Sequence, residues 1–347
     1  MKASSVVLID NLPSGVPGPE HFRIDSSDVS DSVGDNGILI KILVMSADPY
    51  LRGRIKAPGD GNIAAGEVMA GFVGGKVLKS ANSKWVEGDL FGAHLPFATV
   101  QLLTGDVLAK TLMWKLTDMI TEDNISYSIG ILGMPGATAY GGLVDVLRPK
   151  PSETIFISAA SGAVGGLVGQ MSKQIYDCKV IGSCGGEEKC NLVKDSFGYD
   201  AAVDYKQVAN ATELIAKLKE VAPDGIDMYF ENVGGMHFEA SMEVLRPRGR
   251  IAVCGQISEY NSATPQLCAF NPMKMIYTNQ RIEGFVSTRW LSGQEGNFLV
   301  DMHKWLTEGK LKPQETFFDG IDQWPNAFQS LFTGQNVGKV VIRTGDN

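Results

Sequence analysis

No cysteine occurs before residue 178, and no part of the chain carries the His-Glu-x-x-His pattern of a zinc enzyme. An odd number of cysteines, here five, in a long chain is not typical of a disulfide framework. Cys178, Cys184 and Cys190 are separated by five residues each, whereas the cysteine pairs of structural zinc sites are usually separated by two to four. The four histidines are scattered. We therefore expect no metal site, and we interpret the cysteines as buried or idle thiols.

Long apolar runs and an excess of positive charge are also missing. No stretch approaches the roughly 20 apolar residues of a membrane span. The 31 lysines and arginines against 39 acidic residues give a net charge of −8, which argues against nucleic acid as a partner. The opening MKASSVVLID lacks the long apolar core of a signal peptide. We expect a cytoplasmic protein with neither membrane nor nucleic acid as its partner.

The 347 residues, of which 44% are hydrophobic and 20% charged, are enough for about two globular domains. Residues 38–50 and 66–78 are rich in β-branched and apolar residues and are interrupted by glycine and proline. This pattern is typical of short strands and turns. We therefore predict a compact, mostly-β unit over the first 130 residues.

The middle of the chain alternates short apolar runs with stretches of helical spacing. Such alternation predicts a parallel sheet covered by helices on both faces, and right-handed crossovers make it a doubly wound α/β sheet. A helix over 324–332 and a strand over 337–344 follow, and that strand could return to the first domain. The predicted strands of the sheet are 154–160, 179–183, 201–205, 226–231, 250–255 and 281–286, and the helices are 164–176, 187–197, 211–221 and 237–245.

The sharpest local motif is AASGAVGG at 159–166, where the first of these strands ends and a helix begins. We interpret it as a Rossmann dinucleotide fingerprint with alanine at the first glycine position. Gly162 lets backbone approach a pyrophosphate, Gly165 permits close packing of helix on strand, and the helix N-terminus presents free amides. The alternative is a glycine-rich turn used only for packing.

The end of the second strand indicates which dinucleotide binds. An NAD site places an acid about 20 residues after the fingerprint, but here the strand ends in Ser-Cys-Gly-Gly at 183–186. Lys189 just beyond is placed to pair with a 2′-phosphate, so we predict NADPH as the cofactor. Asn232, after the fourth strand, lies at the switch point of such a sheet. The alternative for Lys189 is a solvated surface lysine, and the alternative for Asn232 is a role in an Asn-x-Gly turn.

Six segments together resemble the medium-chain dehydrogenase/reductase superfamily, and within it the zinc-independent double-bond reductases such as prostaglandin, plant alkenal and bacterial curcumin reductases. The resemblance implies a GroES-like catalytic domain made of 1–130 and 310–347, and a Rossmann domain over 131–309. It also implies a homodimer formed by edge-to-edge pairing of the last Rossmann strand. The segments are ADPYLR (47–52), GMPGATAY (133–140), AASGAVGG (159–166), YFENVGG (229–235), RIAVCGQISEYN (250–261) and NVGK (336–339).

The resemblance also assigns the cofactor contacts by motif. For each of these contacts, the alternative is that the residue serves only in the core or on the surface of the protein. The implied contacts are Gly162, Ala163, Val164, Gly165, Lys189, Tyr205, Asn232, Cys254, Gly255, Gln256, Ile257, Ser258, Glu259, Tyr260, Phe285, Val286, Ser287 and Asn336.

The chain departs from zinc-dependent relatives, which carry Gly-His-Glu where this sequence has Gly-Glu-Val at 66–68. Without a metal, the substrate must already accept hydride well, as an α,β-unsaturated aldehyde or ketone does at its β-carbon. The resemblance points to Tyr277 as the donor that stabilises or protonates the enolate, and to Tyr50 as a second candidate. The expected function is thus the reduction of such a double bond by NADPH. The alternative functions are those of an NADPH:quinone oxidoreductase and of a non-catalytic NADPH-binding protein.

Overall fold

The computed structural model describes residues 1–59, 61–264 and 266–345. By its internal contacts the chain forms two compact units. The first contains Met1–Gly133, Glu315–Asn336 and Val340–Asn347, and the second contains Met134–Gln314 and Val337–Lys339. The division predicted from the sequence has its boundaries after residues 130 and 309. Within the described residues, no helix combines the length and apolarity that crossing a bilayer requires.

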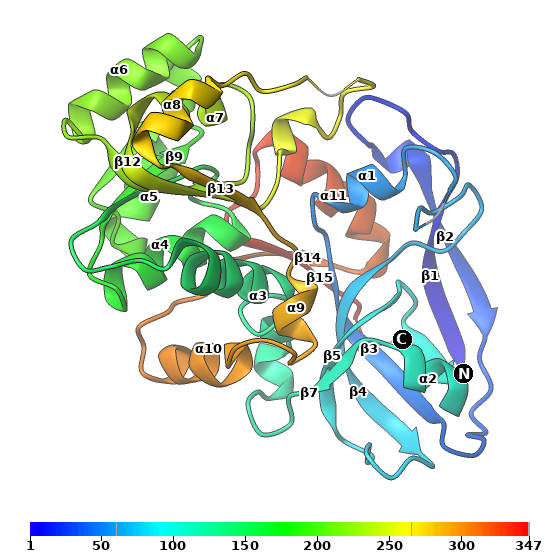
Figure 1. The fold of residues 1–347 in the computed structure, drawn as a ribbon. Coiled ribbons are helices and arrows are strands. Elements are labelled where there is room, and N and C mark those ends of the chain that lie inside the picture. The colour runs from blue at the N-terminus through cyan, green and yellow to red at the C-terminus, as the bar shows by residue number, and fades with distance from the viewer. Residues whose placement is uncertain (60, 265, 346–347) are drawn as a thin grey trace. The chain divides into compact units, whose positions relative to one another are not determined.

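The second unit is built on six parallel strands in the order β10-β9-β8-β11-β12-β13 (Figure 1). Counted from β8, this order is 3-2-1-4-5-6, the doubly wound Rossmann arrangement, so the predicted fold class is confirmed. The fourth strand pairs with the first, as the switch point requires. The strands are β8 (Thr154–Ile157), β9 (Lys179–Cys184), β10 (Ala201–Asp204), β11 (Ile226–Glu231), β12 (Leu245–Val253) and β13 (Arg281–Gly284).

Helices cover both faces of this sheet (Figure 1). α4 (Ala163–Gln174) and α5 (Glu187–Phe197) lie on one face, and α6 (Ala211–Val221) and α7 (Met236–Val244) lie on the other. α6 shows why such segments fold. Asn210 caps its N-terminus by accepting from the Glu213 amide at 3.1 Å, and Leu214 and Leu218, four residues apart, bury one face.

Several short elements of this unit were not predicted. They are α8 (Pro272–Thr278), α9 (Thr288–Leu291), α10 (Phe298–Thr307), the 3-10 turns η4 (Tyr205–Gln207) and η5 (Ile257–Glu259), and α3 (Met134–Tyr140), which continues into the π-helix η3 (Gly141–Leu147). Glycines make that π-helix possible beside aromatic rings. A Cβ on Gly141 would lie 2.3 Å from Trp290, and one on Gly142 would lie 2.5 Å from Phe285.

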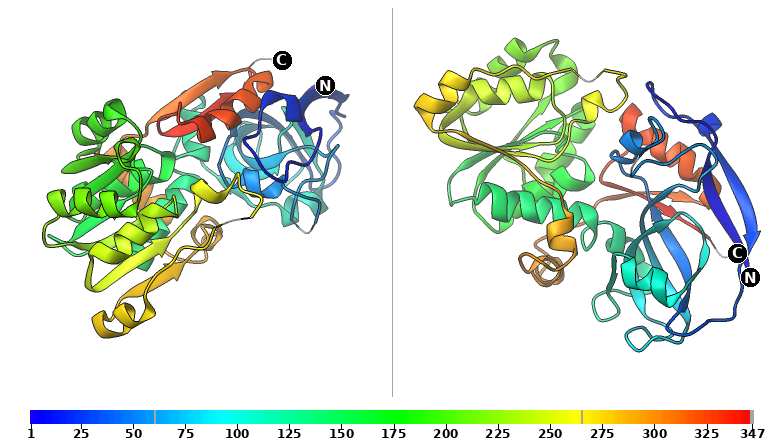
Figure 2. Two further views of the ribbon diagram at one scale, coloured as in Figure 1. Left: turned by 90° about the horizontal axis from the view of Figure 1, so that it is seen from above. Right: turned by 45° about the vertical axis from the view of Figure 1, so that its right-hand side comes forward.

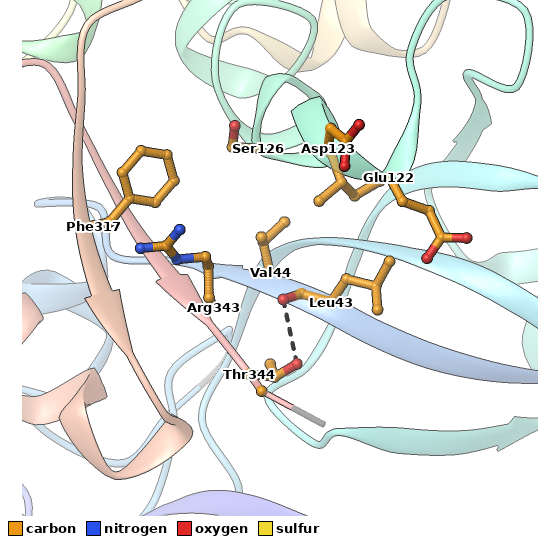
Figure 3. Close-up of a pocket in the computed structure, with 10 residues that line it drawn as sticks. Leu43, Val44, Glu122, Asp123, Ser126, Phe317, Arg343 and Thr344 are labelled. Atoms are coloured by element: carbon orange, nitrogen blue, oxygen red, sulfur yellow. Dashed lines mark hydrogen bonds between the residues drawn. The ribbon is translucent and has the colours of Figure 1, made fainter. Parts of the chain in front are cut away.

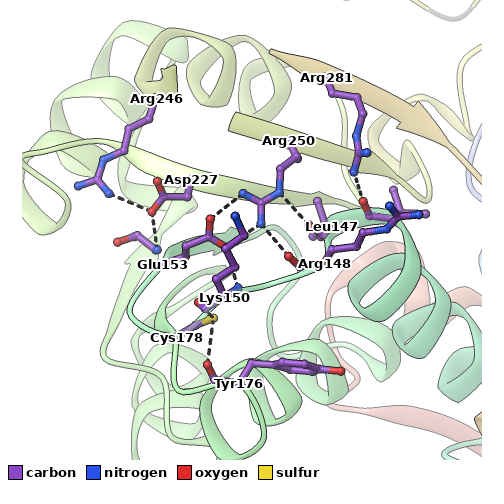
Figure 4. A network of polar contacts seen from close by, with 12 residues as sticks. Leu147, Arg148, Lys150, Glu153, Tyr176, Cys178, Asp227, Arg246, Arg250 and Arg281 are labelled. Carbon is purple, nitrogen blue, oxygen red and sulfur yellow. Dashed lines mark hydrogen bonds and ion pairs between the residues drawn. The ribbon is translucent and has the colours of Figure 1, made fainter. Parts of the chain in front are cut away.

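A polar network joins the end of η3 to the sheet (Figure 4). Arg250 binds both carboxylate oxygens of Glu153 at 2.8 and 2.7 Å, and it donates to the Leu147 carbonyl at 2.7 Å. Arg246 pairs with Asp227 at 2.9 Å. Glu153 and Asp227 stand where β8 and β11 begin, so this network occupies the edge of the sheet formed by the amino ends of the strands.

The first unit is mostly antiparallel β structure. One sheet has the order β14-β15-β3-β4-β5-β7, β6 pairs with β3, and β1 and β2 form a separate pair (Figure 2). Val341 in β15 pairs with Ser46 in β3, which confirms that the closing strand returns to the first domain. The strands are β1 (Lys2–Leu8), β2 (Phe22–Asp28), β3 (Ile38–Ser46), β4 (Ala70–Ser80), β5 (Leu90–Pro96), β6 (Val100–Leu103), β7 (Met113–Lys115), β14 (Glu315–Asp319) and β15 (Lys339–Arg343).

The helical turns of this unit are short except for α11 (Trp324–Thr333). Trp324 and Phe328 of α11 are fully buried in its core, where their rings stack at 5.0 Å. The others are η1 (Pro19–His21), α1 (Leu51–Arg54), α2 (Gly105–Lys110), η2 (Glu122–Ile129) and η6 (Ile321–Gln323).

Candidate functional site

Predicted cofactor residues follow the carboxyl end of every strand in the parallel sheet. Gly162 and its neighbours follow β8, Lys189 follows β9, Tyr205 follows β10 and Asn232 follows β11. Residues 254–260 follow β12, and 285–287 follow β13. Carboxyl ends of parallel strands lie at one edge of a sheet, and ligands of doubly wound folds bind at that edge. The structure therefore brings these residues together on one side of the second unit.

The fingerprint loop has the geometry that its glycines predict. Gly162 is the N-cap of α4, and its φ and ψ of −83° and 176° are extended. A Cβ on Gly165 would lie 2.3 Å from the Ala159 carbonyl oxygen, so only glycine lets the helix pack this closely on the strand. Ala163 and Val164 form the first turn of α4, and the amides of a first helical turn are the donors that would hold the phosphate of the predicted cofactor.

The NVGK motif lies against this loop. Gly338 donates its amide to the Ser161 carbonyl at 2.8 Å, and Gly162 and Gly338 form a parallel bridge. Gly338 has a φ of 64°, and a Cβ there would overlap the Gln314 carbonyl. Asn336 directly precedes this segment. The motif therefore supports the fingerprint loop, a structural role that was not predicted from the sequence.

At the end of β9, the side chain of Asp204 holds the second glycine of the predicted adenosine site. The Asp204 carboxylate accepts from the amides of Gly186 and Lys206 at 2.8 and 3.0 Å. The Tyr205 hydroxyl lies 2.9 Å from the position of a Cβ on Gly185, so this tyrosine covers the strand end. Lys189 stands on the first turn of α5, where burial lowers the pKa of its ammonium group.

Ser158 and Glu231 form a buried network behind Asn232 that sequence reasoning missed. The Ser158 hydroxyl accepts from the Asn232 amide at 2.9 Å, and the Asn232 side chain donates to the Ser158 carbonyl at 2.7 Å. One carboxylate oxygen of Glu231 accepts from the amides of Val233 and Gly234 at 2.6 and 2.9 Å. Burial raises the pKa of Glu231. The sequence did contain a signal for this network, because each of two mostly apolar runs ends in a polar residue: Ser158 directly follows β8, and Glu231 is the last residue of β11.

The segment 254–260 bends back over the same turn. Cys254 and Gly255 donate their amides to the Glu231 carbonyl, and Ile257 and Ser258 donate to the carbonyls of 232 and 233. Burial raises the pKa of the Cys254 thiol to about 12, so it remains protonated. Gln256 caps the start of the turn η5, Glu259 is the last residue of this turn, and Gln256 donates its backbone amide to the Tyr260 hydroxyl at 3.3 Å. Burial also raises the pKa of the Tyr260 phenol.

Beyond β13, Phe285 packs edge-on against Phe230 and Trp290, at ring-centroid distances of 6.0 and 5.8 Å. Val286 is 65% exposed, and Ser287 begins the short helix α9. Phe285 is thus held by the core, whereas Val286 presents its side chain to solvent at the edge where the cofactor is predicted to bind.

Tyr277 is not placed with these residues. It lies on α8, before β13 begins, and its side chain is 78% exposed. Lys274 of the same helix donates to the Glu243 carbonyl, just before β12 starts, so α8 lies toward the amino ends of the strands. β13 spans four residues, or roughly 10 Å, between that end and the edge where the cofactor residues gather.

Tyr50 belongs to the first unit, where it precedes α1. Its ring packs edge-on against Phe72 at 6.3 Å, and Phe72 in turn contacts His94 at 5.2 Å. The Tyr50 hydroxyl is buried and has no hydrogen-bond partner among the described residues. Burial, with the charge of Asp48, raises the pKa of this phenol far above its usual value.

A cavity of about 260 Å³ opens elsewhere in the first unit (Figure 3). Arg343 projects into it but is already engaged, since it lies 4.5 Å from the Phe317 ring and pairs with Asp319 at 2.7 Å. The residues that line it are Leu43, Val44, Glu122, Asp123, Ile125, Ser126, Phe317, Arg343, Thr344 and Gly345, none of which was predicted as a site residue. Within the described ranges, no three His, Cys, Asp or Glu side chains are grouped to hold a metal ion.

The carboxyl edge fits a phosphorylated dinucleotide. The extended Gly162 opens toward the edge, since the nearest atom to a Cβ there is the loop's own Ala159 carbonyl at 3.2 Å. At the end of β9, Gly186 has a φ of 101° and open space around it, and Asp204 is turned to backbone amides. The strand end is thus open, with lysines and a tyrosine beside it, which suits a 2′-phosphate.

Comparison with known proteins agrees with this geometry. Residues 163–302 match the family model described as zinc-binding dehydrogenase, and residues 6–111 match that of the N-terminal domain of oxidoreductase. The chain is 35% identical to the NADPH-dependent curcumin reductase of Escherichia coli (strain K12), over 98% of this chain and 97% of that protein. It is 37% identical to the NADP(+)-dependent 2-alkenal reductase of Nicotiana tabacum, over 97% and 96%.

A solved structure is similar over the same length. CurA from Vibrio vulnificus in complex with NADPH is 33% identical, with a TM-score of 0.86, and covers 99% of this chain and 100% of that one. Full-length similarity of this degree indicates common descent with these reductases. The strand order and the fingerprint loop agree with the same family. The chain belongs to the double-bond reductase branch of the medium-chain dehydrogenase/reductase superfamily.

Proposed function

We infer that the protein is an NADPH-dependent reductase of the carbon–carbon double bond in α,β-unsaturated aldehydes and ketones. The observation that carries this inference is the set of residues for a 2′-phosphorylated dinucleotide at one sheet edge. They occur in a chain that is 35–37% identical, over nearly its whole length, to a curcumin reductase and a 2-alkenal reductase.

Bound NADPH supplies a hydride to the β-carbon of the substrate. Negative charge then develops on the substrate's carbonyl oxygen, where a hydrogen-bond donor lowers the barrier. We propose Tyr260 for this role in place of Tyr277. The support is its position after β12 and its hydroxyl, 3.3 Å from the Gln256 amide. Burial raises the pKa of this phenol, so it keeps its proton at neutral pH.

The two tyrosines make a matched pair for mutation. We expect Tyr260→Phe to lower kcat by about 10²–10³, the usual effect of losing one such donor. We expect Tyr277→Phe to leave kcat and KM unchanged, because its side chain is 78% exposed on a helix that precedes β13. The reverse result would return the role to Tyr277.

We propose that Tyr50 shapes the substrate site. Its buried hydroxyl has no hydrogen-bond partner among the described residues, so it can donate to a substrate oxygen. The ring of Tyr50 packs on Phe72, which in turn contacts His94. Tyr50→Phe should therefore raise KM for an enone substrate, with a smaller change in kcat. Equal KM values for the variant and the wild type would remove Tyr50 from the site.

The activity itself is tested by following NADPH absorbance with a medium-chain 2-alkenal, with NADH and a quinone in parallel. We expect rapid oxidation of NADPH, slow oxidation of NADH, and a saturated aldehyde as the product. Turnover with the quinone alone would identify a quinone oxidoreductase. Tight NADPH binding with no turnover on either acceptor would indicate a non-catalytic protein.

We propose that no zinc takes part, because Gly-Glu-Val at 66–68 replaces the Gly-His-Glu of zinc-dependent relatives. Metal analysis of the purified enzyme, and full activity after dialysis against a chelator, would support this. Stoichiometric zinc that is lost together with activity would refute it. We also propose a cytoplasmic location, on the sequence grounds given above.

We propose a homodimer formed through β13. This strand is at the edge of the six-stranded sheet, and Ile276 and Val286, which lie on either side of it in sequence, are 64% and 65% exposed. An unpaired edge beside exposed apolar side chains is suited to pairing with a second copy. Sedimentation equilibrium should give twice the chain mass, and a monomer would contradict the proposal.

A further inference from the structure

Lys206 lies over the same strand end as Lys189 and Tyr205. If Gly185 had a Cβ, that atom would be 3.1 Å from Cε of Lys206 and 2.9 Å from the Tyr205 hydroxyl. The side chain of Lys206, although exposed, therefore passes over the tip of β9. The absence of a Cβ at Gly185 leaves room for both side chains to approach the strand end.

The backbone fixes this arrangement. Asp204 accepts from the amides of Gly186 and Lys206, at 2.8 and 3.0 Å, and so ties the start of η4 to the loop after β9. Asp204 thereby uses its carboxylate on the backbone, and Lys206 forms no ion pair with any carboxylate of the described residues. Other lysines of this unit do pair, for example Lys173 with Asp200 at 2.6 Å and Lys274 with Glu243 at 2.9 Å.

Lys189 and Lys206 follow the neighbouring parallel strands β9 and β10, so both bring a positive charge to the same end of the sheet. Burial is the largest cause that lowers the pKa of Lys189. The charge of Lys206 also lowers it, whereas the charges of Cys184 and Glu188 act in the opposite direction. A dianion that binds at this strand end would therefore be attracted by both cations.

We propose that Lys206 is a second cation for the 2′-phosphate of NADPH, and that with Lys189 it determines the preference for NADPH over NADH. The proposal rests on the placement of the adenosine end proposed above. It adds a residue that follows the predicted contact Tyr205 and that the sequence motifs did not single out. A lysine acts here as a point charge, so its contribution depends on charge and falls with salt.

The test measures NADP⁺ and NAD⁺ binding to the full-length protein by titration calorimetry, and thus needs no substrate. We expect Lys206→Ala to weaken NADP⁺ binding about fivefold, the size of a solvent-exposed charge pair, and to leave NAD⁺ binding unchanged. Raising the salt concentration should reduce this difference between the variant and the wild type. Lys206→Glu should weaken NADP⁺ binding further, again without effect on NAD⁺.

Lys219, an exposed lysine near the C-terminal end of α6, provides the matched control. Lys219→Ala should bind both dinucleotides like the wild type. The proposal is overturned if Lys206→Ala leaves NADP⁺ affinity unchanged, if it weakens both dinucleotides equally, or if the wild type does not prefer NADP⁺. Failure of the reductase activity would show instead in the alkenal assay, with the binding preference intact.

Discussion

Lowering the pH should destabilise the second unit through His237. This residue lies in the first turn of α7 and is 3% exposed. Its Nε2 lies 2.8 Å from the Ser183 hydroxyl, and its ring is stacked with Phe156 and meets Tyr205 edge-on at 5.7 Å. Burial lowers the pKa of His237 to about 4, because the charged imidazolium would lose its hydration.

The sign and size follow from the difference between folded and unfolded states. An unfolded histidine titrates near 6.5, so the folded chain favours the neutral form, and its stabilising effect is complete above that pH. It is lost as the pH falls from 6.5 toward 4. The difference between about 4 and 6.5 corresponds to about 3 kcal/mol, of which about 2 kcal/mol are lost by pH 5.

Glu231 opposes this change, since burial raises the pKa of its carboxyl group. A group with a raised pKa stabilises the fold at low pH and loses that effect as the pH rises. Wild-type stability alone therefore does not isolate His237. The comparison with His237→Gln does, because Glu231 and the other carboxylates titrate in both proteins.

The direct assay is an NMR titration of protein labelled at histidine Cε1. The His237→Gln variant identifies the His237 signal by its absence, and we expect that signal to remain neutral down to about pH 5 in the folded protein. Thermal melting at pH 7.5 and pH 5 should show a larger fall for the wild type than for the variant. A His237 signal that titrates near 6.5 while the protein stays folded would refute the reasoning.

Three further substitutions test packing, capping and the amino-edge network. Gly165→Ala should weaken NADPH binding at least tenfold in calorimetry, because its Cβ would lie 2.3 Å from the Ala159 carbonyl; unchanged affinity would contradict the fingerprint assignment. Asn210→Ala should cost about 1 kcal/mol by removing the cap on α6, seen as faster amide exchange there, whereas Asn210→Ser should not. Arg250→Met should cost about 2 kcal/mol in thermal melting, since it leaves Glu153 and two carbonyls without their donor, and a neutral result would show that water replaces the guanidinium.

The Rossmann unit was largely predictable because its strands are buried on both faces. Such strands form continuous apolar runs, as TIFI in β8 and the apolar residues of β11 do, and the intervening helices have a clear period. The predicted ranges of α5 and α6 agree with the structure, and the closing strand returns to the first unit as expected. The helix α8 was not predicted because it has no buried residue to create a period.

Other features were hidden because they depend on tertiary contacts. The two glycines of η3 are required because a Cβ at either position would meet the ring of Trp290 or Phe285. Both rings are distant in sequence, so the local pattern does not distinguish these glycines from turn glycines. Ser158 and Glu231 similarly acquire a role only when β8 and β11 become neighbours. Gly338 is required by a carbonyl of Gln314, which is 24 positions earlier. A local pattern does not contain these distances.

The two tyrosines show how strand direction could have replaced motif similarity. In a parallel sheet, a residue that follows a strand lies at the carboxyl edge, and one that precedes a strand lies at the amino edge. Tyr260 follows β12 by seven residues, whereas Tyr277 precedes β13 by four. Both strands were predicted from the sequence, so their order along the chain already separated these phenols by the length of a strand. The same rule puts Glu153, which directly precedes β8, in the stabilising network at the amino edge and the cofactor residues at the opposite edge.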